Sequence, residues 1–380
     1  MPTRKAFATD LLGGHPPSAF LRRFWQKEPL LVRGAVPGFA GLFTREELFA
    51  LAGRDDVESR LIVRNGSRWT LDHGPFRKAH FKTLPATRWT LLVQGVNLHS
   101  DAADALLRRF AFAPYARLDD LMVSYAAPGG GVGPHFDSYD VFLLQGQGHR
   151  RWQYGRQDDL ALKAGLPVKI LRNFAPQFDA VLTPGDMLYL PPSCAHDGVA
   201  VGPCTTYSIG FRAASFDEFG QGFLDHLRDH LALTGRYADP GLKSSDEPAR
   251  IGKAMQKRVD SALRKIQWDA RATARFLGTY LSEPKQDVVF DRPRPRISPA
   301  AFAKAVARRG VALDRRTQWL YDDDTIYVNG ETAPWPPGER GLLAALANGR
   351  ALSAAQAASL AATELAFLYD GYSHGFLHVS

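Results

Sequence analysis

Hydrophobic and polar positions along the first 84 residues alternate between two periods. Apolar residues at helical spacing predict helices over 18–27 and 44–52, and alternating runs predict strands over 60–64 and 68–72. Thr44-Arg-Glu-Glu47 is a capping box, in which the side chains at both ends satisfy free backbone N–H groups, so a helix begins after Thr44. We expect residues 1–84 to form an α/β extension that packs on the rest of the chain.

From residue 85 to 215 the pattern changes to short strand-like runs separated by Gly and Pro. Many short strands with turn residues between them are typical of an all-β sandwich or barrel. The predicted strands span 89–93, 121–126, 139–145, 150–154, 180–182, 187–190 and 205–211.

Helical periodicity returns between residues 217 and 281, with apolar side chains near i, i+3 and i+4 spacing. The segment 291–296 alternates Pro with Arg, which cannot continue a helix, so it joins this region to a last unit over 297–380. That unit shows a helix, a hairpin of strands 318–321 and 325–328, and Ala-rich helices that include a packed amphipathic helix over 351–366. The order is that of a winged helix, and the fold class is mixed α+β.

Composition agrees with a folded protein. Hydrophobic residues make up 45% of the 380 residues and charged residues 23%, which excludes a disordered chain. The formal charge of +8 favours contact with nucleic acid or ribosomes, although charge reports association and not chemistry.

Targeting and redox signals point to the cytoplasm. The basic first ten residues are followed by no apolar stretch, and no run approaches 18 uncharged apolar residues, so we expect neither a secretion signal nor a membrane span. Cys194 and Cys204 are too few for a disulfide framework or a four-cysteine zinc site, which indicates a reducing compartment. A single disulfide between them stays open.

The residues that indicate a metal site are His135-Phe136-Asp137 and His196. On an extended segment residues i and i+2 point to the same face, so His135 and Asp137 can meet at one point. Two histidines and one carboxylate form the facial triad that suits Fe(II), with positions left for an oxidisable co-substrate and dioxygen. The 59 positions from Asp137 to His196 leave room for about four strands, enough for a jelly roll to bring both ends together.

Other interpretations of these residues remain open. The three ligands could be ordinary core or surface residues, and Cys194 could act as a metal ligand, although a thiolate would favour zinc. His99-Ser-Asp101 repeats the His-x-Asp spacing, but it precedes a helical pattern, where Ser100 or Asp101 is more naturally an N-cap. The glycine run 129–133 before His135 would let the backbone approach a bound group closely.

Three segments together resemble the bacterial JmjC-type ribosomal oxygenases: the run 122–152, the run Pro184 to Pro192, and Tyr207 to Arg212. The resemblance is strong over residues 85–215 and extends in domain order to the whole chain. It implies a double-stranded β-helix (jelly-roll, cupin/JmjC-like) catalytic domain over 85–215, a helical dimerisation region over 216–290 and a C-terminal winged-helix-like domain over 297–380. It also implies an Fe(II)- and 2-oxoglutarate-dependent homodimer that hydroxylates an arginine of the sixteenth protein of the large ribosomal subunit.

The resemblance also implies roles for individual residues. His135, Asp137 and His196 match the iron ligands, Arg150 matches the residue that pairs with the distal carboxylate of 2-oxoglutarate, and Ser124 lies where a hydroxyl helps to hold that co-substrate. A guanidinium fork is independently suited to bidentate carboxylate binding. The alternative for Arg150 is an exposed cationic strand.

Substrate contacts are expected at Tyr139 and Asp140, beside the metal motif, where a substrate guanidinium could meet a ring and a carboxylate. A solvated or packing role for both is the alternative. Two rival functions stay open: a JmjC hydroxylase or demethylase acting on a histidine or methyl-lysine of another protein, and a non-catalytic protein that binds nucleic acid or ribosomes through its basic winged-helix-like unit. The second would be marked by a missing metal ligand, and none is missing.

Overall fold

Two facing β-sheets form the centre of the molecule in the computed structural model, which describes residues 11–337 and 340–380. The large sheet has eight strands in the order β1-β9-β6-β11-β5-β4-β2-β3, and every neighbouring pair is antiparallel. Its strands are β1 (Leu30–Val32), β2 (Ser59–Asn65), β3 (Arg68–His73), β4 (Trp89–Val93), β5 (Leu118–Ala126), β6 (Val141–Gln145), β9 (Met187–Leu190) and β11 (Cys204–Phe211).

A small sheet of β10 (Ala195–Ala200), β7 (Arg150–Gly155) and β8 (Phe178–Leu182) lies against the inner face of the large one. Trp152 and Leu182 of the small sheet share a buried apolar cluster with Leu143 and Leu188 of the large sheet. Four strands, β6 to β9, separate Asp137 from His196, as the spacing predicts. The sequence-based prediction of a jelly-roll core is therefore confirmed.

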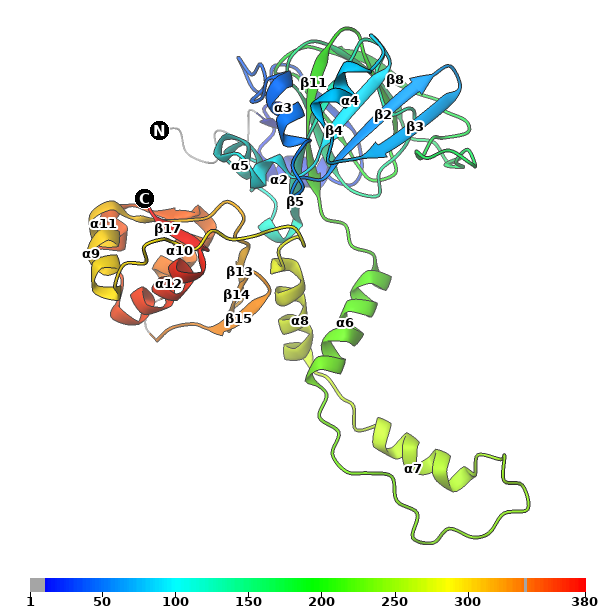
Figure 1. Ribbon diagram of the computed structural model, residues 1–380, viewed down its shortest axis with the longest axis vertical. Coiled ribbons are helices and arrows are strands. Elements are labelled where there is room, and N and C mark those ends of the chain that lie inside the picture. Colours follow the sequence, from blue (N-terminus) through cyan, green and yellow to red (C-terminus); the bar gives the residue numbers. More distant parts are fainter. Residues whose placement is uncertain (1–10, 338–339) are drawn as a thin grey trace.

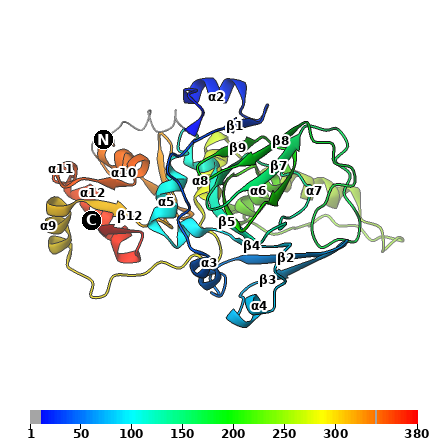
Figure 2. The same cartoon turned by 90° about the horizontal axis from the view of Figure 1, so that it is seen from above.

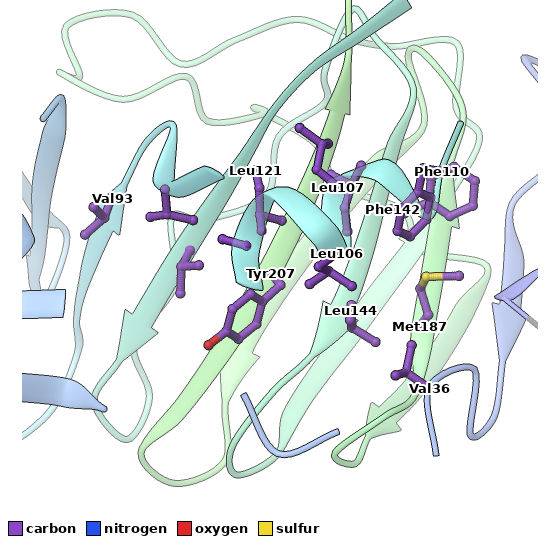
Figure 3. Packing of buried hydrophobic residues seen from close by; sticks show 14 of the residues in the cluster. Val36, Val93, Leu106, Leu107, Phe110, Leu121, Phe142, Leu144, Met187 and Tyr207 are labelled. Carbon is purple, nitrogen blue, oxygen red and sulfur yellow. The ribbon is translucent and has the colours of Figure 1, made fainter. Parts of the chain in front are cut away.

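The outer face of the large sheet carries the main hydrophobic core (Figure 3). Leu106 and Leu107, at the end of helix α5 (Asp101–Arg108), pack over the sheet with Phe110, Phe142 and Tyr207. Complete burial of side chains of this size contributes about 1.5–3 kcal/mol each. Alternation along each strand therefore assigns one set of residues to this outer core and the other set to the interior of the sandwich.

The N-terminal elements extend the large sheet and do not form a separate layer, because β1, β2 and β3 all pair within it. Helix α2 (Pro17–Arg23) ends four residues before the predicted end, whereas α3 (Arg45–Leu51) begins after Thr44 with the predicted capping box. The other short helices are α4 (Lys78–Lys82), η1 (Val96–Leu98) and η2 (Tyr115–Arg117).

Three helices follow the core: α6 (Phe216–His230), α7 (Lys253–Leu263) and α8 (Ala270–Ser282). Helices α6 and α8 pack together through aromatic contacts such as Phe223–Phe276, with ring centroids 5.4 Å apart. Helix α7 projects from this pair, at the end of the molecule farthest from the β-sheets (Figure 1). No helix of the described residues is both long and apolar enough to span a membrane.

The last unit lies to one side of the core in both views (Figures 1 and 2). It contains the predicted hairpin, β13 (Trp319–Tyr321) and β14 (Thr325–Val328), with β15 (Glu331–Pro334) beside it. Its other elements are α9 (Pro299–Arg309), β12 (Val311–Leu313), α10 (Gly341–Gly349), β16 (Ala351–Leu352), α11 (Ala354–Ala357), α12 (Ala362–His374) and β17 (Leu377–Val379).

The prediction of one amphipathic helix over residues 351–366 is wrong. Leu352 pairs with Val311 of β12, so the segment begins as a strand. Ser353 then starts α11 through a capping box with Gln356, and α12 starts after Ala361, whose N–H donates to the Glu364 carboxylate. Tertiary β-pairing and two successive helix caps override the helical propensity of alanine here.

Candidate metal centre

The two candidate histidine ligands lie on neighbouring antiparallel segments. The His135 N–H donates to the His196 carbonyl at 2.9 Å, and the His196 N–H donates to the His135 carbonyl at 2.8 Å. His196 belongs to β10, whereas His135 forms an isolated bridge and not part of a longer strand. This single bridge is enough to place both imidazoles side by side, with ring centroids 4.2 Å apart.

Asp137 completes the cluster. One ligand atom from each of His135, Asp137 and His196 lies within 4.8 Å of the other two, and His196 Nε2 is 3.7 Å from an Asp137 oxygen. Among the described residues this is the one group of three or more His, Cys, Asp or Glu that could hold a metal ion. Two imidazoles and one carboxylate fit Fe(II) and leave part of its coordination sphere open.

Both imidazoles are oriented by backbone carbonyls. His135 Nδ1 lies 2.8 Å from the Gly133 carbonyl, and His196 Nδ1 lies 2.9 Å from the Cys194 carbonyl. Because a carbonyl oxygen only accepts, each Nδ1 carries the proton and each Nε2 presents its lone pair to the centre. In both cases the carbonyl belongs to the residue two positions earlier. The sequence does not predict this orienting role of Gly133 and Cys194, because every residue has a backbone carbonyl.

Burial keeps His196 in the form that a metal needs. Loss of solvent, together with the neighbouring His135, lowers the pKa of His196 to about 4, although Asp137 opposes this shift. The imidazole is therefore neutral at physiological pH.

Two of the glycines before His135 lie close against the protein's own backbone. A Cβ at Gly131 would lie 2.5 Å from the Gly198 carbonyl oxygen, and one at Gly130 would lie 2.2 Å from the Trp89 carbonyl oxygen. The glycine run thus packs closely against the protein's own backbone. Gly198 belongs to β10 and Trp89 to β4, so the glycine run that leads to His135 is packed against both strands.

Arg150 points into the sandwich from β7 and is only 4% exposed, so it is not an exposed cationic strand residue. Its Nε and Nη2 have no hydrogen-bonding partner among the described residues, and neither does the buried Trp152 Nε1. The guanidinium lies 5.6 Å from the Trp152 ring, which is 5.9 Å from the His196 ring. Buried donors of this kind are rarely left unpaired, and they fit an anionic ligand that extends from the metal centre.

Ser124 lies on the interior face of β5, because its neighbours Val123 and Tyr125 both belong to the outer core. It is 3% exposed, and its hydroxyl donates to the Thr206 carbonyl at 3.5 Å. The Thr206 hydroxyl in turn donates to Gln145 at 3.4 Å. These side chains give the interior face of the large sheet a group of buried polar atoms.

Tyr139 lies beside the cluster and is 38% exposed. Partial burial, followed by the adjacent Asp137 carboxylate, raises the pKa of its phenol, so the hydroxyl remains a donor at neutral pH. The predicted strand over 139–145 begins only at Val141, which leaves Tyr139 in the turn that follows Asp137.

Asp140 lies elsewhere. It is fully buried, its Oδ1 accepts from the Tyr189 hydroxyl at 2.6 Å, and its Oδ2 accepts from Gln26 at 3.1 Å and lies 3.6 Å from Arg117. The structure therefore places this carboxylate in the outer core and not at the metal centre, which corrects the expectation that it meets a substrate guanidinium.

The other candidate ligands are also placed elsewhere. Cys194 is buried, and burial raises the pKa of its thiol to about 11, so the thiol is protonated at neutral pH. It does not belong to the group formed by His135, Asp137 and His196. Both cysteines are free, so the disulfide that the sequence left open does not form. Ser100 caps α5 as expected, and Asp101 pairs with Arg315 at 2.8 Å.

Both the β-sandwich core and the last unit match known protein families. Residues 105–219 match the JmjC domain family, and residues 265–378 match the ROXA-like winged helix family. The ribosomal protein uL16 3-hydroxylase of Escherichia coli is 35% identical over 341 residues, which cover 88% of this chain and 89% of that protein. A probable ribosomal oxygenase of Haemophilus influenzae is 33% identical over 333 residues, covering 83% and 81%.

Solved structures agree with the sequence relatives. The crystal structure of E. coli YcfD superposes with a TM-score of 0.81 at 32% identity, covering 94% of this chain and 96% of that one. Another structure of YcfD, described as a ribosomal oxygenase in complex with cobalt and 2-oxoglutarate, superposes over the same shares with a TM-score of 0.78. A jelly roll with this candidate metal centre, joined to this winged helix and similar to these relatives over most of its length, makes the chain a member of the JmjC-type ribosomal oxygenase family.

Proposed function

We propose that this protein is an Fe(II)- and 2-oxoglutarate-dependent protein hydroxylase. The observation that carries the proposal is the cluster of His135, Asp137 and His196 beside a buried Arg150 that has two unpaired donors. One half of this arrangement suits a metal, and the other half suits the far carboxylate of a dicarboxylic acid. A relative that was solved with cobalt and 2-oxoglutarate supports the pairing of these two ligands.

The chain's own residues then have separate tasks. Fe(II) held by the triad would supply the oxidation chemistry, with dioxygen as oxidant and 2-oxoglutarate as the co-substrate that is decarboxylated. Arg150 binds and orients the distal carboxylate from the small sheet, and Ser124 contributes a hydroxyl from the facing large sheet. Gly133 and Cys194 hold the two imidazoles through their carbonyls. The facing sheets exclude water from the interior.

For the substrate we propose an arginine of the sixteenth protein of the large ribosomal subunit. The supporting observation is the relative named ribosomal protein uL16 3-hydroxylase, which covers most of this chain. Tyr139 is the residue proposed to contact the incoming side chain, because its side chain is partly exposed and lies beside Asp137. We also propose a cytoplasmic location and domains over 85–215, 216–290 and 297–380 after an N-terminal extension.

A peptide assay tests the activity. The purified protein is incubated with Fe(II), 2-oxoglutarate and a peptide from the sixteenth large-subunit protein, and mass spectrometry follows the peptide. We expect a gain of one oxygen on arginine, coupled to succinate formation. Modification of a histidyl or methyl-lysyl peptide instead would reassign the substrate. Absence of any iron-dependent 2-oxoglutarate turnover would favour a non-catalytic binding protein.

We further propose that the helical region forms a homodimer. Apolar side chains along it remain exposed in a single chain: Leu224, Leu231, Leu242, Ile251, Met255, Val259, Leu263, Trp268 and Leu277 are 40–77% exposed. A second copy would remove them from water, and a two-fold arrangement needs only one self-complementary surface.

A further inference from the structure

The positive charge of this chain is concentrated outside its catalytic core. Residues 250–275 contain eight Lys or Arg and two Asp, and residues 292–309 contain six Lys or Arg and no acidic residue. Since the whole chain has 47 basic and 39 acidic residues, the remainder has 33 basic and 37 acidic residues. The two short segments together carry twelve net positive charges, residues 1–84 carry six (14 basic and 8 acidic), and residues 85–215 carry none (11 basic and 11 acidic).

The first segment forms an amphipathic, solvent-exposed arm around α7. Met255, Val259 and Leu263 repeat every four residues and make one apolar stripe. At 3.6 residues per turn, Lys253, Lys257 and Arg264, the C-cap residue of α7, lie within about 40° of one another on the opposite side. All three basic side chains are exposed, and Figure 1 shows the helix projecting from the rest of the molecule.

Little within the chain neutralises this basic face. Arg264 pairs with Asp260 at 2.8 Å, but Lys253 and Lys257 have no ion pair in the described part of the chain. A row of cations on a projecting helix produces a local positive potential that attracts a polyanion over about 8–10 Å at physiological salt.

We propose that the basic face of α7, made by Lys253, Lys257 and Arg264, binds the phosphate backbone of RNA. Adjacent phosphates form a line of negative charge that a row of Lys and Arg can follow without reading the sequence. Insertion into an acidic membrane would instead need the apolar stripe, and the proposed homodimer covers that stripe with the second copy.

The proposal explains a charge pattern that catalysis does not. A basic ribosomal protein gains nothing from a positively charged enzyme surface, whereas RNA does. The neutral catalytic core over 85–215 and the basic arm therefore suit two different partners, the protein substrate and the RNA near it. RNA binding by α7 does not depend on the proposed hydroxylase activity. The proposed function only suggests which RNA is bound, namely the ribosomal RNA near the protein substrate.

The test compares two triple variants of the full-length protein. One is Lys253→Gln, Lys257→Gln and Arg264→Gln. The matched control is Lys163→Gln, Lys169→Gln and Arg172→Gln, which removes the same charge from an exposed loop of the core. Fluorescence anisotropy measures binding to a labelled 20-nucleotide single-stranded RNA between 50 and 250 mM KCl.

We expect the α7 variant to lose about tenfold or more in RNA affinity at the lowest salt. The slope of log affinity against log salt should become shallower by about 2, because three phosphate contacts are lost and each contributes about 0.7 to the slope. The control should keep the affinity and slope of the unmodified protein. Both variants should keep their dimer mass and 2-oxoglutarate turnover, so failure of this inference is distinguishable from failure of the proposed activity.

The proposal would be overturned by RNA binding that the α7 substitutions leave unchanged, by an equal loss in the loop control, or by no RNA binding of the unmodified protein. Binding to phosphatidylserine vesicles that 20-nucleotide RNA fails to displace would assign the face to a membrane surface instead.

Discussion

At the scale of single residues, the candidate metal centre has no donor to spare. Three side chains and an open coordination sphere are the minimum for this chemistry, and no described fourth His, Cys, Asp or Glu joins the cluster. We predict that His135→Ala or Asp137→Ala abolishes iron-dependent 2-oxoglutarate turnover and leaves the circular dichroism spectrum unchanged.

The chain supplies a matched control for this experiment in His99 and Asp101, which have the same spacing but lie at the start of α5. His99→Ala should retain normal turnover. Near-normal activity of either triad variant, with iron present, would refute the ligand assignment.

Arg150 allows a second prediction at this scale. Arg150→Ala removes a charge-assisted pair worth about 1.5–3 kcal/mol, so the 2-oxoglutarate concentration for half-maximal turnover should rise by about ten- to a hundredfold. Arg150→Lys keeps the charge without the planar fork and should recover only part of this loss. An unchanged half-saturating concentration in the alanine variant would mean that another group holds the carboxylate.

At the scale of elements, Asp186 ties the turn before β9 to the chain that follows β1. Its carboxylate accepts from the N–H and hydroxyl of Thr183, at 2.9 and 3.0 Å, from the Gly34 N–H at 2.9 Å, and from Arg33 at 2.7 Å. Partial burial alone would raise the pKa of Asp186, but these donors outweigh it and hold the pKa below its usual value.

We predict that Asp186→Asn lowers the free energy of unfolding by about 1–3 kcal/mol at pH 7, with the share from half-exposed Arg33 the smallest. A carboxylate with a lowered pKa stabilises the fold above its unfolded-state pKa of 3.8 and loses that effect as the pH falls further. The difference in urea unfolding midpoint between the unmodified protein and Asp186→Asn should therefore be largest at pH 7 and shrink below pH 4. Asp158→Asn, on an exposed loop, is the control, and an effect as large there would contradict the prediction.

At the scale of the whole molecule, the exposed apolar stripe predicts assembly. Light scattering of the purified protein should give twice the monomer mass of 41.9 kDa. Val259→Asp with Leu263→Asp places two carboxylates in the proposed interface and should yield monomers. Val201→Asp, at a 61% exposed position of the core, should remain dimeric. A monomer mass for the unmodified protein at working concentrations would refute the dimer.

Short-range sequence patterns were enough to predict much of the fold and of the candidate site. The capping box at Thr44, the hairpin at 318–328 and most strands follow from short-range patterns whose physical basis lies within a few residues. The triad could also be recognised from the sequence, because residue type and i, i+2 spacing already limit what His135 and Asp137 can do together.

Contacts between distant residues decided the rest. Asp140 is adjacent to the metal motif in sequence, but Tyr189 and Gln26, 49 and 114 positions away, hold it in the outer core. Pairing with β12 turned Leu352 from a predicted helix into a strand. The carbonyls that orient both imidazoles and the burial of Arg150 exist only once the two sheets face each other. Periodicity indicates which face of an element is apolar, but only packing determines what covers that face and which polar groups are left without a partner.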